Sequence, residues 1–329
     1  MNQQEETYYH CIAPKDSDYK IWAFDDYSHL FSRNNEFILA KPVYCSINAP
    51  INFDYSFYRK KALRGEEYIN LIYKTVPGQE TRMNSDNEIK ALITSACPGI
   101  DRVNCYYRNP FSSSFISFNK GDVVDTSSPR KALSMMKKAS PQLDSIISLV
   151  EDTLNVSESQ IGVTGSLALG AEEVHDYDIV FYGNIVELNQ IQKRISAQIT
   201  QNGPVFETGL KWPCRYYDRN GNIICCFFNI EDSFNLDPAF VTDSFPQNQR
   251  ITFQVRVADD SFSIAKVPIL LLEENEQFNV LVIFSRAFRG VFKSGDTISG
   301  VGNISADGKT ILCFDPANSI TDWIKYFNR

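Results

Sequence analysis

The chain has 329 residues, 43% of them hydrophobic and 13% aromatic, which is enough apolar material for two or three packed units. Its formal net charge of −8 argues against a protein whose whole surface binds nucleic acid. No apolar run is long enough for a transmembrane helix, and the first residues lack the basic start and apolar core of a secretory signal. We therefore expect a cytoplasmic protein with no membrane partner.

Short aromatic and β-branched runs dominate residues 17–119. The runs "YKIWAF", "EFILAKPVYCSI" and "FSSSFISF" are separated by Asn, Asp, Pro and Gly, which is typical of strands joined by turns. The segment "GEEYINLIYKT" instead favours a helix, because four of its apolar residues have helical spacing: Tyr68, Ile69, Ile72 and Tyr73. We predict that residues 1–135 form a mostly β region that this helix interrupts.

Two amphipathic helices are expected in the middle of the chain. In "SPQLDSIISLVEDTLNV", Ser140 can cap the helix and Pro141 suits its first turn. The apolar stripe of this helix is Leu143, Ile146, Ile147, Val150 and Leu154. The segment "VELNQIQKRISAQITQ" predicts the second helix, with Leu188, Ile191, Ile195 and Ile199 on one face.

Between these helices lies the segment "QIGVTGSLALG", which predicts a short buried strand that runs into a tight turn. The strand "DYDIVFYG" follows, and its Asp176 and Asp178 share one face, where their charges repel each other unless a positive charge lies between them. After the second helix comes a hairpin with its turn at residues 218–221. Residues 136–234 thus predict a compact α/β core.

Residues 235–329 are expected to return to β structure. The segments "RITFQVRVA", "NVLVIFSRAF" and "TISGVGNIS" have the composition of strands, with turns at "KSGD" and "SADGK". A small barrel or sandwich is the natural arrangement for such strands. The predicted fold class is therefore α+β, with an α/β core between a mostly β N-terminal region and a small C-terminal β module.

The eight cysteines are scattered without a C-x-x-C pair or clustered histidines, so neither a zinc site nor a disulfide framework is indicated. We expect reduced, mostly buried thiols, and we interpret Cys225 and Cys226 as packing residues of a buried strand. His175 is expected to point away from the aspartates and to serve packing or hydrogen bonding. The basic segments "FYRKKALRG" and "PRKALSMMKK" are interpreted as solvated faces of helices or turns.

The Gly-Ser turn followed by an acid-x-acid strand resembles the nucleotidyltransferase superfamily, which includes DNA polymerase beta, poly(A) polymerases and antibiotic adenylyltransferases. Gly165, Ser166, Asp176 and Asp178 match its pattern. More narrowly, the chain is similar to a family of predicted nucleotidyltransferases found largely in archaea, whose members carry an N-terminal extension and a C-terminal β module. The segments that carry this similarity are "IGVTGSLALG", "DYDIVFYG", "KWPCRYYDRNGN", "VRVADDSFS" and "RAFRGVFKSGDTISGVGNIS".

The resemblance implies that Asp176 and Asp178 hold Mg²⁺ or Mn²⁺, because hard cations in such sites are held by one or two carboxylates and the substrate phosphates. Gly165 permits close approach of the backbone, and the Ser166 hydroxyl with nearby amide groups receives the terminal phosphates. An NTP donor such as ATP is therefore the expected partner.

Two basic residues flank the predicted hairpin, and their roles stay open. Lys211 and Arg215 are either further ligands of the triphosphate or cross-strand partners of surface acids such as Asp218.

Many transferases carry a third carboxylate on the strand after the hairpin, as a general base and metal ligand. Here the strand reads "IICCFFNIED", with Cys225, Cys226 and Asn229 where an acid is sought. The remaining candidates for this acid are Glu231, Asp232, Asp259 and Asp260.

We therefore predict transfer of a nucleotidyl group from an NTP to an unidentified hydroxyl on RNA, a protein or a small molecule, with a defence or toxin-type role open. The N-terminal region is expected to select the acceptor. The alternative is a nucleotide- or RNA-binding module without turnover, because the third acid is missing.

Overall fold

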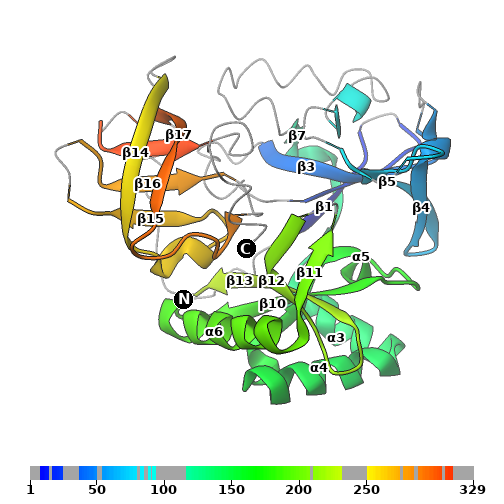
Figure 1. The fold of residues 1–329 in the computed structure, drawn as a ribbon. Coiled ribbons are helices and arrows are strands. Elements are labelled where there is room, and N and C mark those ends of the chain that lie inside the picture. Colours follow the sequence, from blue (N-terminus) through cyan, green and yellow to red (C-terminus); the bar gives the residue numbers. More distant parts are fainter. Residues whose placement is uncertain are drawn as a thin grey trace. The chain divides into compact units, whose positions relative to one another are not determined.

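The structure is a computed structural model that describes residues 8–14, 17–24, 37–49, 54–79, 82–84, 88–89, 91–93, 116–207, 210–231, 250–274, 277–284, 288–305 and 308–313. Over these residues the protein is α+β, with several sheets and one closed barrel (Figure 1), which confirms the expected class. None of the helices in this part of the chain combines the length and the apolar character needed to cross a membrane.

The chain forms two compact units. The first comprises Met1–Met136 and Val163–Val174, and the second comprises Lys137–Gly162 and His175–Arg329. The Gly-Ser turn therefore belongs to the first unit, and the two aspartates belong to the second. The expected three-part division at residues 135 and 234 stays a prediction.

The first unit is built on an eight-stranded antiparallel sheet with the order β4-β5-β3-β2-β1-β8, in which β6 pairs with β5 and β7 pairs with β3. Its strands are β1 (Tyr9–Ile12), β2 (Ile21–Phe24), β3 (Phe37–Ser46), β4 (Tyr58–Leu63), β5 (Glu66–Lys74), β6 (Arg82–Met83), β7 (Ile116–Asn119) and β8 (Val123–Ser127). Its core includes Ile21, Ile38, Ile69, Leu71 and Phe118. The β character expected for this region is confirmed.

The helix expected in "GEEYINLIYKT" is wrong, because the segment forms strand β5. This strand pairs with β3, β4 and β6, so its backbone groups bond to neighbouring strands. Tyr68, Ile69 and Leu71 are buried. Tyr and Ile favour pleated surfaces, and a strand buried on both faces carries no clean period of two, so its apolar residues also fitted helical spacing.

The second unit contains a five-stranded mixed sheet with the order β11-β12-β13-β10-β9. Its strands are β9 (Ile161–Val163), β10 (Asp176–Gly183), β11 (Pro204–Glu207), β12 (Leu210–Tyr217) and β13 (Ile223–Ile230), and the expected hairpin is the β12–β13 pair. Strand β10 runs parallel to β13 and has β9 on its other side. The aspartates therefore begin an internal strand, not an edge strand.

The helices are α3 (Pro129–Ala139), α4 (Pro141–Leu154), α5 (Gly165–Ala168) and α6 (Ile185–Asn202). The two amphipathic helices are confirmed as α4 and α6, although Ser140 holds the N-cap position of α4 without a side-chain hydrogen bond. Asn184 and Glu187 form a capping box that begins α6 directly after β10. Helix α6 packs on the strands of the mixed sheet, and α4 packs against α6 (Figure 1).

The expected C-terminal β module is a closed barrel with the order β14-β15-β16-β18-β17. Its strands are β14 (Arg250–Asp259), β15 (Ile269–Leu272), β16 (Val280–Ile283), β17 (Thr297–Ile304) and β18 (Thr310–Cys313). Strands β15 and β18 were not predicted, because each is a four-residue apolar run without clear alternation. The barrel core includes Phe253, Val257, Leu281, Phe292 and Ile311.

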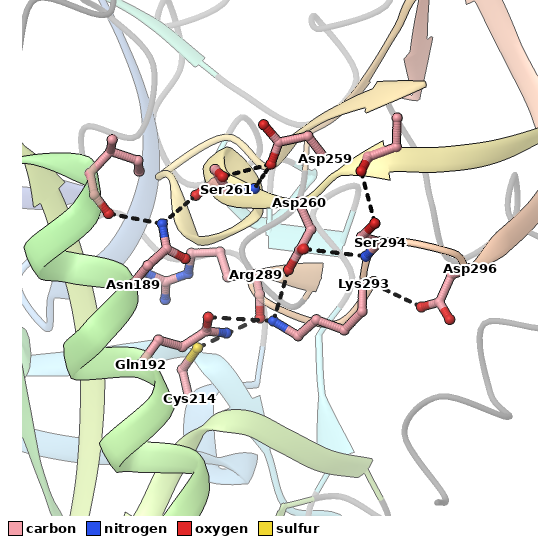
Figure 2. Close-up of polar contacts among 12 residues, drawn as sticks. Asn189, Gln192, Cys214, Asp259, Asp260, Ser261, Arg289, Lys293, Ser294 and Asp296 are labelled. Atoms are coloured by element: carbon pink, nitrogen blue, oxygen red, sulfur yellow. Dashed lines mark hydrogen bonds and ion pairs between the residues drawn. The ribbon is translucent and has the colours of Figure 1, made fainter. Parts of the chain in front are cut away.

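Polar contacts join α6 to the barrel within the second unit (Figure 2). Asn189 Nδ2 on α6 donates to the Ser261 carbonyl oxygen at 2.8 Å. Lys293 Nζ lies 3.2 Å from Asp260 Oδ2 and 3.4 Å from Gln192 Oε1. Asp260, which directly follows β14, therefore takes part in this junction.

Candidate metal centre and the Gly-Ser turn

A row of three polar side chains crosses the mixed sheet. Asp178 on β10 is the register partner of Cys225 on β13, and Cys225 is the register partner of Arg215 on β12. Residues directly opposite each other in a sheet present their side chains on the same face, and so do residues two apart in one strand. Asp176 therefore shares this face with Asp178.

Asp176, Asp178 and Cys225 form a tight group in which one ligand atom from each lies within 4.8 Å of the others. The Cys225 thiol donates a hydrogen bond to Asp176 Oδ2 at 3.2 Å. Cys225 is buried with 1% of its surface exposed, whereas both aspartates are half-buried. In the described ranges this is the only such group of three metal-ligating side chains.

The environment disfavours the charged form of the Cys225 thiol. Burial is the main cause and raises its pKa well above 9.0. The Arg215 charge opposes this effect, while the carboxylates of Asp178 and Asp176 raise the pKa of the thiol further. A protonated thiol is a hydrogen-bond donor, which agrees with its contact to Asp176.

The donor set fits a divalent cation. Two carboxylates on one face provide the hard oxygen ligands that Mg²⁺ and Mn²⁺ prefer. Cys225 adds a softer sulfur atom beside them, at the strand position opposite Asp178. The sequence interpretation of Cys225 as a packing residue was therefore incomplete, because the residue is both buried and in contact with a candidate ligand. Its place in the register was the missing signal.

The acids considered as a third carboxylate lie elsewhere. Asp259 Oδ1 accepts hydrogen bonds from Ser261 N at 2.8 Å and from Ser261 Oγ at 2.6 Å. Asp260 pairs with Lys293, so each of the two acids has a partner close by in the barrel region (Figure 2). Neither belongs to the grouped ligands.

The other two candidates follow β13. Glu231 is exposed, and its backbone N–H donates to the Gly183 carbonyl oxygen. Asp232 lies outside the described residues. Among the described residues, the third member of the group is thus a thiol and not a carboxylate.

Arg215 lies beside the group, and its guanidinium carbon is 4.6 Å from the centre of the Trp212 ring. Asp218, its suggested cross-strand partner, instead accepts from the backbone N–H groups of Asn220 and Asn222 in its own turn, each at 2.8 Å. Lys211 lies on β12, and its side chain is outside the described part. Arg215 is therefore the basic residue that the sheet places next to Cys225.

The Gly-Ser turn is described within the first unit. Gly165 has a φ of 68°, in the left-handed region that favours glycine. Ser166 is buried, with 8% of its surface exposed, and its Oγ accepts a hydrogen bond from Lys61 Nζ at 3.1 Å. Sequence reasoning missed Lys61, which lies 105 residues earlier on β4, and treated its segment as a solvated basic face.

His175 is exposed and directly precedes β10. The packing role expected for it is therefore wrong, because the strand begins one residue later and leaves this side chain in solvent. The alternative, a hydrogen-bonding role, stays a prediction. It is not among the grouped ligands.

Comparisons with protein-family models, with curated proteins and with solved structures found no match to the chain. The functional argument therefore depends on the chemistry of the described residues.

Proposed function

We propose that the protein is a metal-dependent nucleotidyltransferase, which moves a nucleoside monophosphate group from an NTP to a hydroxyl acceptor. The observation that carries this proposal is the grouping of Asp176, Asp178 and Cys225 within 4.8 Å on neighbouring parallel strands. Two carboxylates that share a face at the start of an internal strand suit a divalent cation with a bound phosphate. The Gly-Ser turn ahead of that strand is the sequence feature that supports phosphate transfer over other metal chemistry.

In the proposed reaction, the acceptor oxygen forms a bond to the α-phosphorus of the NTP. The bond from that phosphorus to the bridging oxygen breaks, and pyrophosphate leaves. The acceptor proton passes to water. Mg²⁺ or Mn²⁺ held by Asp176 and Asp178 supplies charge neutralisation at the phosphate oxygens when bound.

Two further assignments belong to the proposal. Arg215 contributes a positive charge on the strand next to Cys225, where a phosphate group gains charge-assisted hydrogen bonds. Gly165 and Ser166 are assigned to phosphate binding from the resemblance. The acceptor is a hydroxyl on RNA, a protein or a small molecule.

A second candidate function is a nucleotide- or RNA-binding module without turnover. The observation that favours it is Cys225, because the strand position opposite Asp178 carries a neutral thiol where a third carboxylate would serve as general base. Binding would then depend on Asp176, Asp178 and Arg215, while transfer would not occur.

Pyrophosphate release separates the two functions. The full chain is incubated with each labelled NTP, with Mg²⁺ or Mn²⁺ and with a panel of RNA, protein and nucleotide acceptors. The enzyme proposal expects release that Asp176→Asn and Asp178→Asn abolish. The control Asp152→Asn makes the same charge change at an exposed position of α4 and should retain release.

NTP binding without release in the wild type, across the whole panel, would support the binding module. Release that survives in both aspartate variants would contradict the assignment of the site.

A further inference from the structure

The N-terminal sheet supplies a lysine to the Gly-Ser turn. Lys61 lies on β4, and its Nζ donates to Ser166 Oγ at 3.1 Å and to the Glu173 carbonyl oxygen at 3.2 Å. All three residues belong to the first unit. A fixed cation therefore lies within hydrogen-bond distance of the serine assigned to phosphate binding.

Other contacts hold the same turn against the N-terminal sheet. Ser127 Oγ at the end of β8 donates to the Ala168 carbonyl oxygen at 3.4 Å. A Cβ built on Gly170 would lie 3.5 Å from the backbone nitrogen of Arg64, so the turn packs closely against the β4–β5 hairpin. Because these contacts do not involve Lys61, the turn has attachments that persist without its ammonium group.

A second observation at the turn points to a ligand. Thr164, directly before Gly165, is buried with 1% of its surface exposed, and its Oγ1 has no hydrogen-bond partner among the described residues. A buried hydroxyl without a partner is costly and calls for an explanation, such as a bound group that completes its hydrogen bonds. Thr164 and Ser166 thus place two hydroxyl groups on either side of Gly165.

We infer that Lys61 and Ser166 bind the terminal phosphates of the NTP donor. The inference rests on the proposed function for the class of ligand. A lysine ammonium is a compact charge with three donors and is a common phosphate ligand. The N-terminal β region then contributes to donor binding, beyond the acceptor selection that the sequence suggested for it.

Tripolyphosphate is the probe for this site, because it carries the charge of the triphosphate without the nucleoside. Its binding to the full chain is measured by titration calorimetry without metal, so the Asp176 and Asp178 site does not contribute. We expect Lys61→Met to weaken binding at least about tenfold, as for loss of a charge-assisted hydrogen bond. Lys61→Arg, which keeps the charge, should recover part of the affinity.

Lys60→Met is the matched control. Lys60 is the exposed neighbour of Lys61 on the same strand, and its Nζ lies 5.8 Å from the centre of the Tyr55 ring. This variant removes the same charge and should bind tripolyphosphate as tightly as the wild type. Equal weakening in both variants would show a nonspecific charge effect and overturn the inference.

A purely structural role for Lys61 has a different signature. A lower melting temperature in Lys61→Met with unchanged tripolyphosphate affinity would overturn the inference, and so would a wild type that does not bind the probe. Pyrophosphate release, measured in parallel, tests the proposed function separately. A wild type that binds the probe through Lys61 but releases no pyrophosphate contradicts the enzyme proposal alone. Release with an NTP KM that Lys61→Met leaves unchanged contradicts the inference alone.

Discussion

Two pairs of acids in the second unit have different surroundings. Asp176 and Asp178 begin β10 of the mixed sheet, whereas Asp259 ends β14 of the barrel and Asp260 directly follows it. In the sequence one pair precedes a β-rich run and the other follows one. The structure adds the register of the neighbouring strands and the contacts of each carboxylate.

The barrel pair is held by nearby donors. Asp259 accepts two hydrogen bonds from Ser261, and Asp260 pairs with Lys293 at 3.2 Å (Figure 2). Ser294 N also donates to Asp260 Oδ1 at 3.2 Å. These carboxylates fix a turn and join it to the rest of the unit, which is a structural role.

Asp176 and Asp178, the pair in the mixed sheet, have different side chains around them. Asp176 accepts a hydrogen bond from the Cys225 thiol, and the two carboxylates share one face with that sulfur within 4.8 Å. A group of this kind brings three ligand atoms together, whereas the barrel acids are tied to protein donors. The comparison shows that the neighbours of an acidic pair help to separate a candidate metal site from a structural turn.

The largest expected difference between the two pairs is in activity. Asp178→Asn should lower the rate of pyrophosphate release by about three orders of magnitude, because several kcal/mol of charge stabilisation is lost and each 1.36 kcal/mol corresponds to a factor of ten. Asp259→Asn should stay within about threefold of the wild-type rate, since it lies outside the group. Similar losses in both variants, with both proteins folded by circular dichroism, would remove the distinction between the pairs.

The thiol provides the next contrast. Cys225→Ser should weaken Cd²⁺ binding about tenfold and leave Mg²⁺ binding nearly unchanged, because sulfur favours soft cations and the carboxylates favour hard ones. Cys313→Ser changes a buried thiol of the barrel and should alter neither affinity. Titration calorimetry with each metal makes the measurement. Cd²⁺ binding that is insensitive to Cys225→Ser would mean that the sulfur is only a packing atom.

Alkaline pH should destabilise the barrel through its buried thiol. Burial raises the pKa of Cys313 from 9.0 to about 12, so the folded state retains a proton that the unfolded state has lost. Its contribution to stability is complete below pH 9 and is lost as the pH rises towards 12, with a slope of at most about 1.4 kcal/mol per pH unit. The free energy of unfolding is measured by urea titration at a series of pH values, and Cys313→Ala should reduce its decrease over this pH range. An unchanged decrease in the variant would mean that other groups cause the pH dependence.

The smallest expected effect is on stability at neutral pH. Asp260→Asn removes a partly exposed ion pair with Lys293 and should lower the free energy of unfolding by about 0.5 kcal/mol. Asp176→Asn, measured without metal, should not lower it, because one of two adjacent like charges is removed and the amide oxygen can still accept from Cys225. Thermal unfolding of both variants tests the contrast, which fails if Asp176→Asn is the more destabilising.

Periodic patterns in the sequence predicted much of this fold. Helices α4 and α6 were predicted because each carries apolar residues at helical spacing, such as Leu143 and Ile147 on α4 and Leu188 and Ile191 on α6, and these residues are buried. Strand β5 failed this test, because its buried run carries no clean period of two and its neighbours lie far away in the sequence. A local sequence pattern does not indicate which strands pair when they are far apart in the sequence.

The local features of the site could likewise be predicted from the sequence. Asp176 and Asp178 share one strand, and Gly165 has the backbone conformation that its tight turn requires. Cys225 and Lys61 join their partners only through pairing or packing of distant segments. Cysteine is common in buried apolar strands, so the sequence alone does not indicate that Cys225 belongs to the site.

The central claim is that the core acids hold a divalent cation and the barrel acids do not. Electron paramagnetic resonance of free Mn²⁺, titrated with metal-free protein, measures this directly. We predict that the wild type and the double variant Asp259→Asn/Asp260→Asn remove the free Mn²⁺ signal alike, while Asp176→Asn/Asp178→Asn leaves it nearly intact. Equal Mn²⁺ binding by the two double variants would contradict the claim.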